Sequence, residues 1–168
     1  RNVFLDVGND NSFQTGIGIL TVNGVIADQA TGVQTLQKRN GGVLILNADN
    51  TYDGNTLVQQ GRLVLSDVGA AGSAASSLQF NTNNVRRSDI EFRLDGSGPF
   101  MIANASVTTG TGGNDGSTRV ITVGPVTSGN ENAEVILPNL TISHAGAYTV
   151  NGGSSSALYF DGANGYRT

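Results

Sequence analysis

Several residue types are scarce or missing in this 168-residue chain, and each absence excludes a class of chemistry. Cysteine is absent, which excludes a disulfide framework, a thiolate nucleophile and a cysteine-ligated metal. No apolar run approaches the roughly 20 residues that a membrane-spanning helix needs. The sequence therefore predicts no membrane insertion by this segment and no redox dependence.

Charged residues are also few, at 13% of the chain, with a net charge of −4. The basic residues are scattered, and the densest pair, Arg86 and Arg87, is typical of a solvated loop. Without a basic stripe there is no electrostatic footprint for nucleic acid. Disorder usually requires low hydrophobicity with high charge, whereas 38% of this chain is apolar. Abundant Gly, Asn and β-branched residues instead predict a folded all-β chain of short strands and tight turns.

Five nine-residue windows share one pattern, in which two alternating apolar residues lead through a polar turn to an aromatic residue. The windows span 5–13, 44–52, 92–100, 140–148 and 158–166. Their last residues predict an aromatic corner that runs along the stack, and the alternative is a sugar-binding platform on the surface. The five aromatic residues are Phe13, Tyr52, Phe100, Tyr148 and Tyr166.

Strand signals recur roughly every 14 to 24 residues, which is the length of one coil of a β-solenoid. Each strand places one apolar row inward, and a single coil cannot bury that row alone, so coils must stack. About eight coils at ~4.8 Å each would form a rod about 40 Å long. The frequent Asn-Gly and Asp-Gly pairs supply the turns, although they also suit the hairpins of a β-sandwich.

The most specific signal lies between Gly42 and Leu63, where two strand patterns flank an Asn-Thr-Tyr-x-Gly turn. This stretch resembles the autotransporter-associated β-strand repeat, also called the passenger-associated transport repeat, of bacterial secreted and surface proteins. It departs from the family pattern at Ala48, where Gly is usual. The upstream text at 22–26 and 36–38 also resembles the family, so the likeness covers residues 16–80. Matching positions are Gly42, Leu44, Leu46, Asn50, Thr51, Tyr52, Gly54, Thr56, Val58, Gly61 and Leu63.

Candidate catalytic residues are weak. His144 is the only histidine, lacks a G-x-S-x-G elbow and sits at an expected turn. Four of the 13 acids occupy Asp-Gly turns, and Glu91 should point outward because it alternates with Ile90 and Phe92. The stretch 112–116 echoes a calcium-binding nonapeptide only once, so backbone capping by Asx turns is the expected role. We expect no catalysis and no cofactor, with calcium as the one candidate considered.

Two Gly/Ser/Thr-rich segments, 70–77 and 108–117, have no apolar period and are expected to bulge from the rod as loops. They are where a recognition surface would lie. They support the alternative function, an adhesin or carbohydrate-binding β module that grips a surface glycan.

The leading interpretation is a right-handed parallel β-solenoid in which residues 1–168 form one domain. The resemblance implies a non-catalytic structural segment of a bacterial extracellular or cell-surface protein, such as a fibre, a sheath or a passenger stalk. Because neither end shows a capping pattern, we expect end-to-end stacking with copies of itself or with flanking repeats. The start at Arg1 suggests a processed or excised piece of a longer secreted polypeptide.

Overall fold

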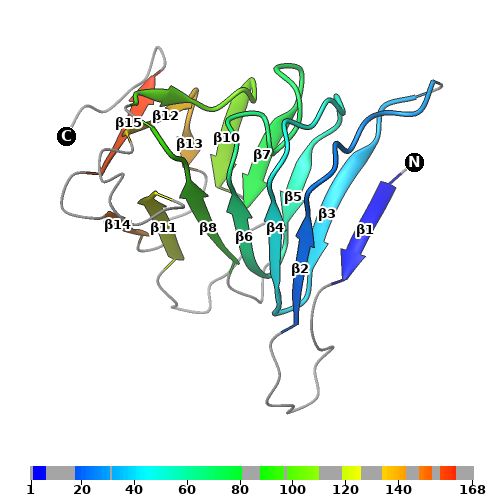
Figure 1. Cartoon of the computed structure of the whole chain (residues 1–168), viewed down its shortest axis with the longest axis horizontal. Coiled ribbons are helices and arrows are strands. Elements are labelled where there is room, and N and C mark those ends of the chain that lie inside the picture. The colour runs from blue at the N-terminus through cyan, green and yellow to red at the C-terminus, as the bar shows by residue number, and fades with distance from the viewer. Residues whose placement is uncertain are drawn as a thin grey trace.

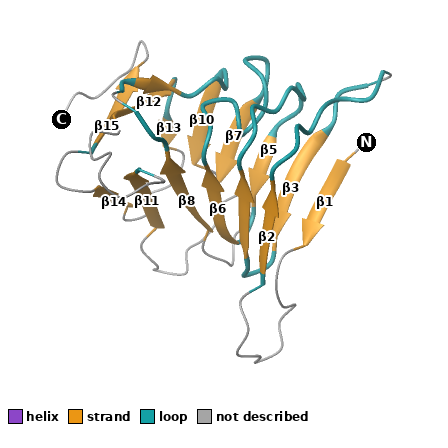
Figure 2. Cartoon of the chain, in the orientation of Figure 1, coloured by secondary structure: helices purple, strands orange, loops and turns teal. Residues whose placement is uncertain are grey.

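The computed structural model describes residues 2–6, 18–30, 32–80, 88–96, 98–109, 119–125, 134–142, 148–152 and 156–161. These residues form strands and loops, with no helix among them (Figure 2). In chain order the strands are β1 (Asn2–Asp6), β2 (Ile19–Val22), β3 (Thr35–Arg39), β4 (Val43–Leu46), β5 (Thr56–Val58), β6 (Gly61–Leu65), β7 (Ser77–Phe80), β8 (Ser88–Arg93), β9 (Phe100–Met101), β10 (Ser106–Thr109), β11 (Arg119–Gly124), β12 (Glu134–Pro138), β13 (Thr141–Ile142), β14 (Tyr148–Gly152) and β15 (Ala157–Asp161).

The strands form three sheets in which every neighbouring pair is parallel (Figure 1). The first sheet has the order β1-β3-β5-β7-β10-β13, the second β14-β11-β8-β6-β4-β2, and the third β15-β12-β9. The chain therefore visits the sheets in turn and returns to each one beside its previous strand. This arrangement is a parallel β-solenoid, as the alternation of strand and turn signals predicted.

The described strands make six turns of the solenoid, which we call rungs 1 to 6, where about eight had been predicted. Rungs 1 to 3 contain β1–β2, β3–β4 and β5–β6, and rungs 4 to 6 contain β7–β9, β10–β12 and β13–β15. Some rungs have the predicted length of 14 to 24 residues, whereas others are longer. Leu44 pairs with Leu63, 19 positions later, whereas Phe100 pairs with Val135, 35 positions later. A third strand lengthens the later rungs, so fewer fit into the chain.

Apolar rows along the inner faces hold the rungs together. In β4, Leu44 and Leu46 are fully buried while Val43 and Ile45 on the other face are half-buried. Full burial of one Leu side chain contributes about 1.5–3 kcal/mol, so each row stabilises the stack along its length. One such row crosses the second sheet through Leu20, Leu44, Leu63, Ile90, Ile121 and Val150.

The side of the solenoid that carries the third sheet changes along the axis. Rungs 2 and 3 cross this side through the irregular connections 47–55 and 66–76, and strands appear there only from β9 onward. Backbone hydrogen bonds still connect rungs 3 and 4 where this change occurs, because the amides of Ala103 and Ala105 donate to the carbonyls of Val68 and Ser76. An irregular rung and a strand-bearing rung can therefore stack directly.

No helix in the described part of the chain combines the length and the apolar character needed to cross a membrane.

Candidate functional site

The Asn-Thr-Tyr-x-Gly turn occupies the connection from β4 to β5, and its Asn50 side chain joins three successive rungs. Its Oδ1 accepts a hydrogen bond from the Ile26 amide at 2.7 Å, and its Nδ2 donates to the Ala70 carbonyl at 2.6 Å. Ile26 precedes Asn50 by one rung and Ala70 follows it by one. An amide side chain carries both a donor and an acceptor, so it satisfies two buried backbone groups that face it from opposite directions.

Tyr52 turns its ring into the core two residues later. Its hydroxyl hydrogen-bonds to Thr56 Oγ1, which in turn donates to the Ala71 carbonyl of the next rung at 2.8 Å. Burial raises the pKa of Tyr52 well above its ordinary value, and the Thr56 contact only partly offsets this. The ring also restricts the next rung, because a Cβ at Gly72 would lie 2.8 Å from Tyr52 Cε2.

The same buried contacts continue into rung 4 through Asn104. Its Nδ2 donates to the Ala71 carbonyl at 2.9 Å and to Ser76 Oγ at 2.6 Å. We call this set of side chains the polar corner; it connects rungs 1 to 4 by hydrogen bonds that lie perpendicular to the strands. The polar corner consists of Asn50, Tyr52, Thr56, Ser76 and Asn104.

Gly54 completes the motif, because the backbone of the preceding rung passes too close to leave space for a side chain. A Cβ at Gly54 would lie 1.9 Å from the Gln34 carbonyl oxygen. Gly61 has a different reason, since its φ of 78° is unfavourable for residues with a Cβ. The local backbone therefore requires glycine at both positions. The sequence pattern alone could only suggest this requirement.

Lys38 is a residue whose role the sequence pattern did not reveal. It follows Leu36 by two positions in β3, so it lies on the inner face, and it is fully buried. Its Nζ donates to the carbonyls of Arg39, Asn40 and Gln60 at 2.8, 2.5 and 2.9 Å. The ammonium group thus joins the turns of rungs 2 and 3 on the side between the first and second sheets.

The remaining predicted repeat positions divide between the core and the surface. Gly42, Leu44, Leu46 and Leu63 are buried, whereas Thr51 is exposed. Thr51 still contributes through its backbone, since its amide donates to the Ile26 carbonyl at 3.0 Å.

Where they are described, the predicted corner aromatics occupy two sides of the solenoid. Tyr52 lies in the connection before β5 and Phe100 lies in β9, both on the side of the third sheet, whereas Tyr148 begins β14 of the second sheet. Phe13 and Tyr166 lie outside the described residues. The nine-residue windows repeat in sequence, but the rungs differ in length, so equal windows do not reach equal positions.

The segment 70–77, expected to bulge as a loop, packs inward over most of its length. Ala70, Ala71 and Ser76 are fully buried, Ala74 and Ala75 are exposed, and Ser77 already begins β7. Its glycine reflects the lack of space beside Tyr52, since a Cβ at Gly72 would lie 2.8 Å from the Tyr52 ring. Of the second expected loop, 108–117, only Thr108 and Thr109 are described, and both belong to β10.

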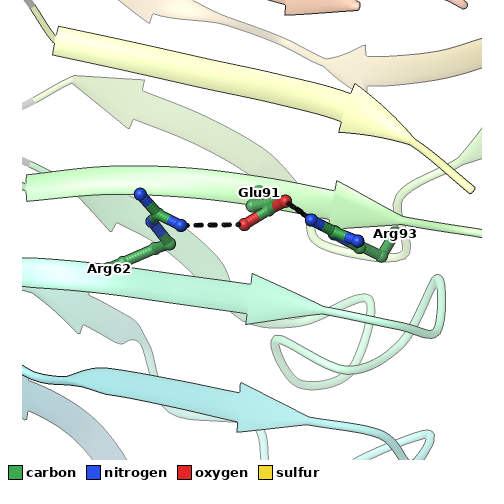
Figure 3. A network of polar contacts seen from close by, with 3 residues as sticks. All are labelled: Arg62, Glu91 and Arg93. Carbon is green, nitrogen blue, oxygen red and sulfur yellow. Dashed lines mark hydrogen bonds and ion pairs between the residues drawn. The ribbon is translucent and has the colours of Figure 1, made fainter. Parts of the chain in front are cut away.

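Glu91 points away from the core, as its alternation with Ile90 and Phe92 predicted, yet its side chain is covered (Figure 3). Oε1 accepts from Arg93 Nε at 2.6 Å, and Oε2 lies 3.5 Å from Nη1 of Arg62 on the adjacent strand β6. Both guanidinium groups are about half-exposed, so this network contributes little to stability. Because both oxygens of the Glu91 carboxylate contact an arginine, we interpret this side chain as a contact between the adjacent strands β8 and β6.

The described residues provide no cluster of metal ligands. Across the described ranges, no group of three or more His, Cys, Asp or Glu side chains could hold a metal ion. His144 and the 112–116 stretch considered for calcium lie outside these ranges.

Among the described residues, most of the exposed large apolar side chains lie in rungs 1 and 6. In rung 1 these are Ile19 and Leu20 of β2, followed by Val25 and Val33 in the connection after it. In rung 6 they are Ile142 of β13, Val150 of β14 and Tyr159 of β15. Among the described strands, β1 and β2 at one end and β13, β14 and β15 at the other pair on one side only.

A comparison with known protein families finds a match in the part of the chain that contains the Asn50–Gly54 turn. Residues 36–65 match the family described as passenger-associated-transport-repeat. The match runs from Leu36 in β3 to Leu65 in β6, so it covers most of rung 2, including the Asn50–Gly54 turn, and both strands of rung 3. Comparisons with curated proteins and with solved structures found no match.

Proposed function

Because residues 36–65 form a passenger-associated transport repeat, we propose that this chain is a non-catalytic structural segment of a bacterial extracellular protein. The repeat is associated with autotransporter passengers, which are secreted or surface-exposed. Within such a protein the solenoid serves as a stalk that sets the distance between the segments on either side of it.

The polar corner is the observation that carries this proposal. The fully satisfied amide of Asn50 spans three rungs, and Tyr52 with Gly72 fits one rung to the next. These residues of the repeat are used entirely in rung-to-rung contacts, which leaves them unavailable for a substrate. A spacer requires axial rigidity, and buried hydrogen bonds between rungs supply it.

A surface-display experiment tests the stalk. We would insert residues 1–168 between the anchoring barrel of an unrelated autotransporter and an epitope-tagged domain. Six rungs should raise the tag above the cell surface by about 29 Å, at ~4.8 Å per rung. Tag height would be measured by fluorescence quenching from the outer leaflet.

The matched control is a flexible Gly/Ser insert of 168 residues. A stalk gives one narrow distribution of heights, whereas the flexible insert gives a broad one. If both inserts gave the same broad distribution, or if the tag were not exported with this chain, the stalk proposal would fail.

A further inference from the structure

We infer that Asn23 is a modification site, at which the chain converts its own asparagine to aspartate and isoaspartate without an enzyme, and that the isoaspartate product loosens rung 1. The reaction requires that the backbone nitrogen of the following residue reach the asparagine carboxamide. Glycine permits this best, because it has no Cβ to obstruct the approach. This chemistry is independent of the proposed function.

The reaction uses only the chain and water. The nitrogen of Gly24 attacks Cγ of Asn23, and a bond forms between the two atoms as the nitrogen loses its proton. The bond from Cγ to Nδ2 then breaks, and ammonia leaves with that proton, which closes a succinimide ring. Water opens the ring at one of its two carbonyl carbons. Opening at Cγ gives aspartate, and opening at the main-chain carbonyl gives isoaspartate.

The fold holds the Asn-Gly pairs of this chain in different ways. Three of these pairs lie in the described part of the chain, and a fourth, 164–165, lies outside it. The three described pairs are Asn23-Gly24, Asn40-Gly41 and Asn151-Gly152.

The peptide group between Asn23 and Gly24 is free to turn. Both residues are exposed in the connection after β2, and a Cβ built on Gly24 would meet nothing within 4 Å. Among the described residues, no backbone hydrogen bond outside the strands involves the Asn23 carbonyl or the Gly24 amide. The contact from Asn47 Nδ2 to Asn23 Oδ1, at 2.8 Å, is exposed, so water can replace it. The Gly24 nitrogen can therefore approach the carboxamide.

The peptide group between Asn40 and Gly41 is fixed by Lys38. Its Nζ donates to the Asn40 carbonyl oxygen at 2.5 Å, and this oxygen lies in the same rigid peptide plane as the Gly41 nitrogen. Lys38 is fully buried and also donates to the carbonyls of Arg39 and Gln60. The plane therefore cannot turn unless the buried ammonium group moves.

The third pair, Asn151 and Gly152, belongs to a strand. Both residues lie in β14 and pair with Thr122 and Val123 of β11. A Cβ at Gly152 would lie 3.1 Å from the Ser156 carbonyl oxygen, so the chain is also close on that side. Strand pairing holds the peptide plane in the extended conformation. Of the three described pairs, the fold leaves Asn23 and Gly24 the most freedom to react.

The two products differ in their effect on rung 1, because position 23 lies between two contacts with rung 2. On one side the Val22 carbonyl accepts from the Asn47 amide at 3.0 Å. On the other side the Ile26 amide donates to Asn50 Oδ1 at 2.7 Å. Aspartate leaves the main chain unchanged, and its carboxylate can still accept from Asn47 Nδ2. Isoaspartate adds one carbon atom to the main chain between the two contacts, so the contact between Ile26 and Asn50 should weaken.

Mass spectrometry of the full chain tests the site. The folded chain would be incubated at neutral pH in isotopically labelled water, so that only conversion during the incubation incorporates the label, and the Asn-Gly peptides would then be quantified. We expect Asn23 to convert about tenfold faster than Asn40. In urea, where Lys38 no longer holds the Asn40 carbonyl, the two rates should become equal. Equal rates in the folded chain, or faster conversion of Asn40, would overturn the assignment.

Gly24→Ala is the matched variant. The folded chain has space for its Cβ, yet this Cβ obstructs the approach of the nitrogen to the Asn23 carboxamide. Conversion at Asn23 should fall about tenfold, while conversion at Asn40 should not change. An unchanged rate at Asn23 would show that ammonia is lost without a succinimide and would overturn the proposed chemistry.

Hydrogen exchange tests the effect on rung 1. In the isoaspartate form, separated by chromatography, the Ile26 amide should exchange about tenfold faster than in the unmodified chain. Asn23→Asp is the control, because it carries the aspartate product on an unchanged main chain, and its Ile26 amide should exchange as in the wild type. Equal protection of Ile26 in all three forms would overturn the loosening of rung 1.

Discussion

At the scale of the residue, the repeat motif consists of side chains that contact the neighbouring rungs. Asn50 supplies one donor and one acceptor to backbone groups on opposite sides, Tyr52 fills the space that Gly72 leaves, and Lys38 binds three carbonyls. All three side chains are buried, and an unsatisfied polar group in a buried position costs about 1–3 kcal/mol. Polar residues therefore determine which rungs fit together, while the apolar rows supply most of the free energy.

The first prediction concerns Asn50. Asn50→Ala removes the partner of the part-buried Ile26 amide and of the buried Ala70 carbonyl, so we expect the free energy of unfolding to fall by about 2–4 kcal/mol. Asn47→Ala is the control, because its contact with Asn23 is exposed and should be worth less than about 0.5 kcal/mol. Urea unfolding followed by circular dichroism measures both, and equal losses would contradict the bridging role.

The second prediction concerns pH. Burial raises the pKa of Tyr52, so the folded state keeps the phenol neutral where the unfolded chain ionises, above about pH 10. The unfolded state then binds fewer protons, and the free energy of unfolding falls with rising pH by up to about 1.4 kcal/mol per unit.

Tyr52→Phe should remove this slope between pH 10 and 11, whereas Tyr159→Phe, at a half-exposed position, should retain it. Urea titrations at several pH values provide the measurement. An unchanged slope in Tyr52→Phe would mean that another group causes the loss.

At the scale of the element, the turns determine how closely successive rungs approach. The connection 47–55 passes against the chain of the preceding rung at Gly54, and 70–76 folds inward against the ring of Tyr52. Short strands of two to six residues are thereby fixed in register at both ends. The connections in rungs 2 and 3 therefore contribute buried side chains to the core, as the strands do.

The third prediction tests one such approach. Gly54→Ala would place a Cβ 1.9 Å from the Gln34 carbonyl oxygen, so the two rungs must separate. We expect a loss of about 1–3 kcal/mol, the usual range for overpacking. Gly24→Ala is the matched control because nothing lies within 4 Å of its Cβ, and its loss should stay below about 0.5 kcal/mol. Thermal and urea unfolding of both variants decide the comparison.

At the scale of the whole molecule, the solenoid is a stack whose stability comes from neighbouring rungs. Its second sheet has six strands, and its apolar row is covered in the middle and half-exposed at both ends. The cross-section also changes, since a third sheet joins the stack from rung 4 onward (Figure 1). The position of a residue along the axis therefore decides how much its burial contributes.

The fourth prediction uses two leucines of the same row. Leu63→Ala creates a cavity at a fully buried position and should cost about 2–5 kcal/mol. Leu20→Ala, in a more exposed position of the same row, should cost less than half as much. Urea unfolding followed by circular dichroism would measure both variants. Similar losses at both positions would contradict this dependence on the position along the row.

The sequence by itself determined the parallel solenoid and the place of the repeat. Alternation assigns Leu44 and Leu46 to the inner face of a strand, and the turn around Asn50 and Gly54 has a specific residue pattern. Both are local properties of the chain, in which side-chain direction follows from a period of two. The rows had to be covered by other rungs because one rung cannot bury them.

Only the tertiary structure decided the features that depend on residues in other rungs. These are the inward packing of 70–76, the carbonyl contacts of Lys38, the covering of Glu91, the number of rungs and the third sheet. Burial and close approach depend on neighbours that lie 19 or more positions away along the chain. A Gly/Ser-rich segment has the same sequence signature whether it faces solvent or the ring of Tyr52, so its place follows from packing alone.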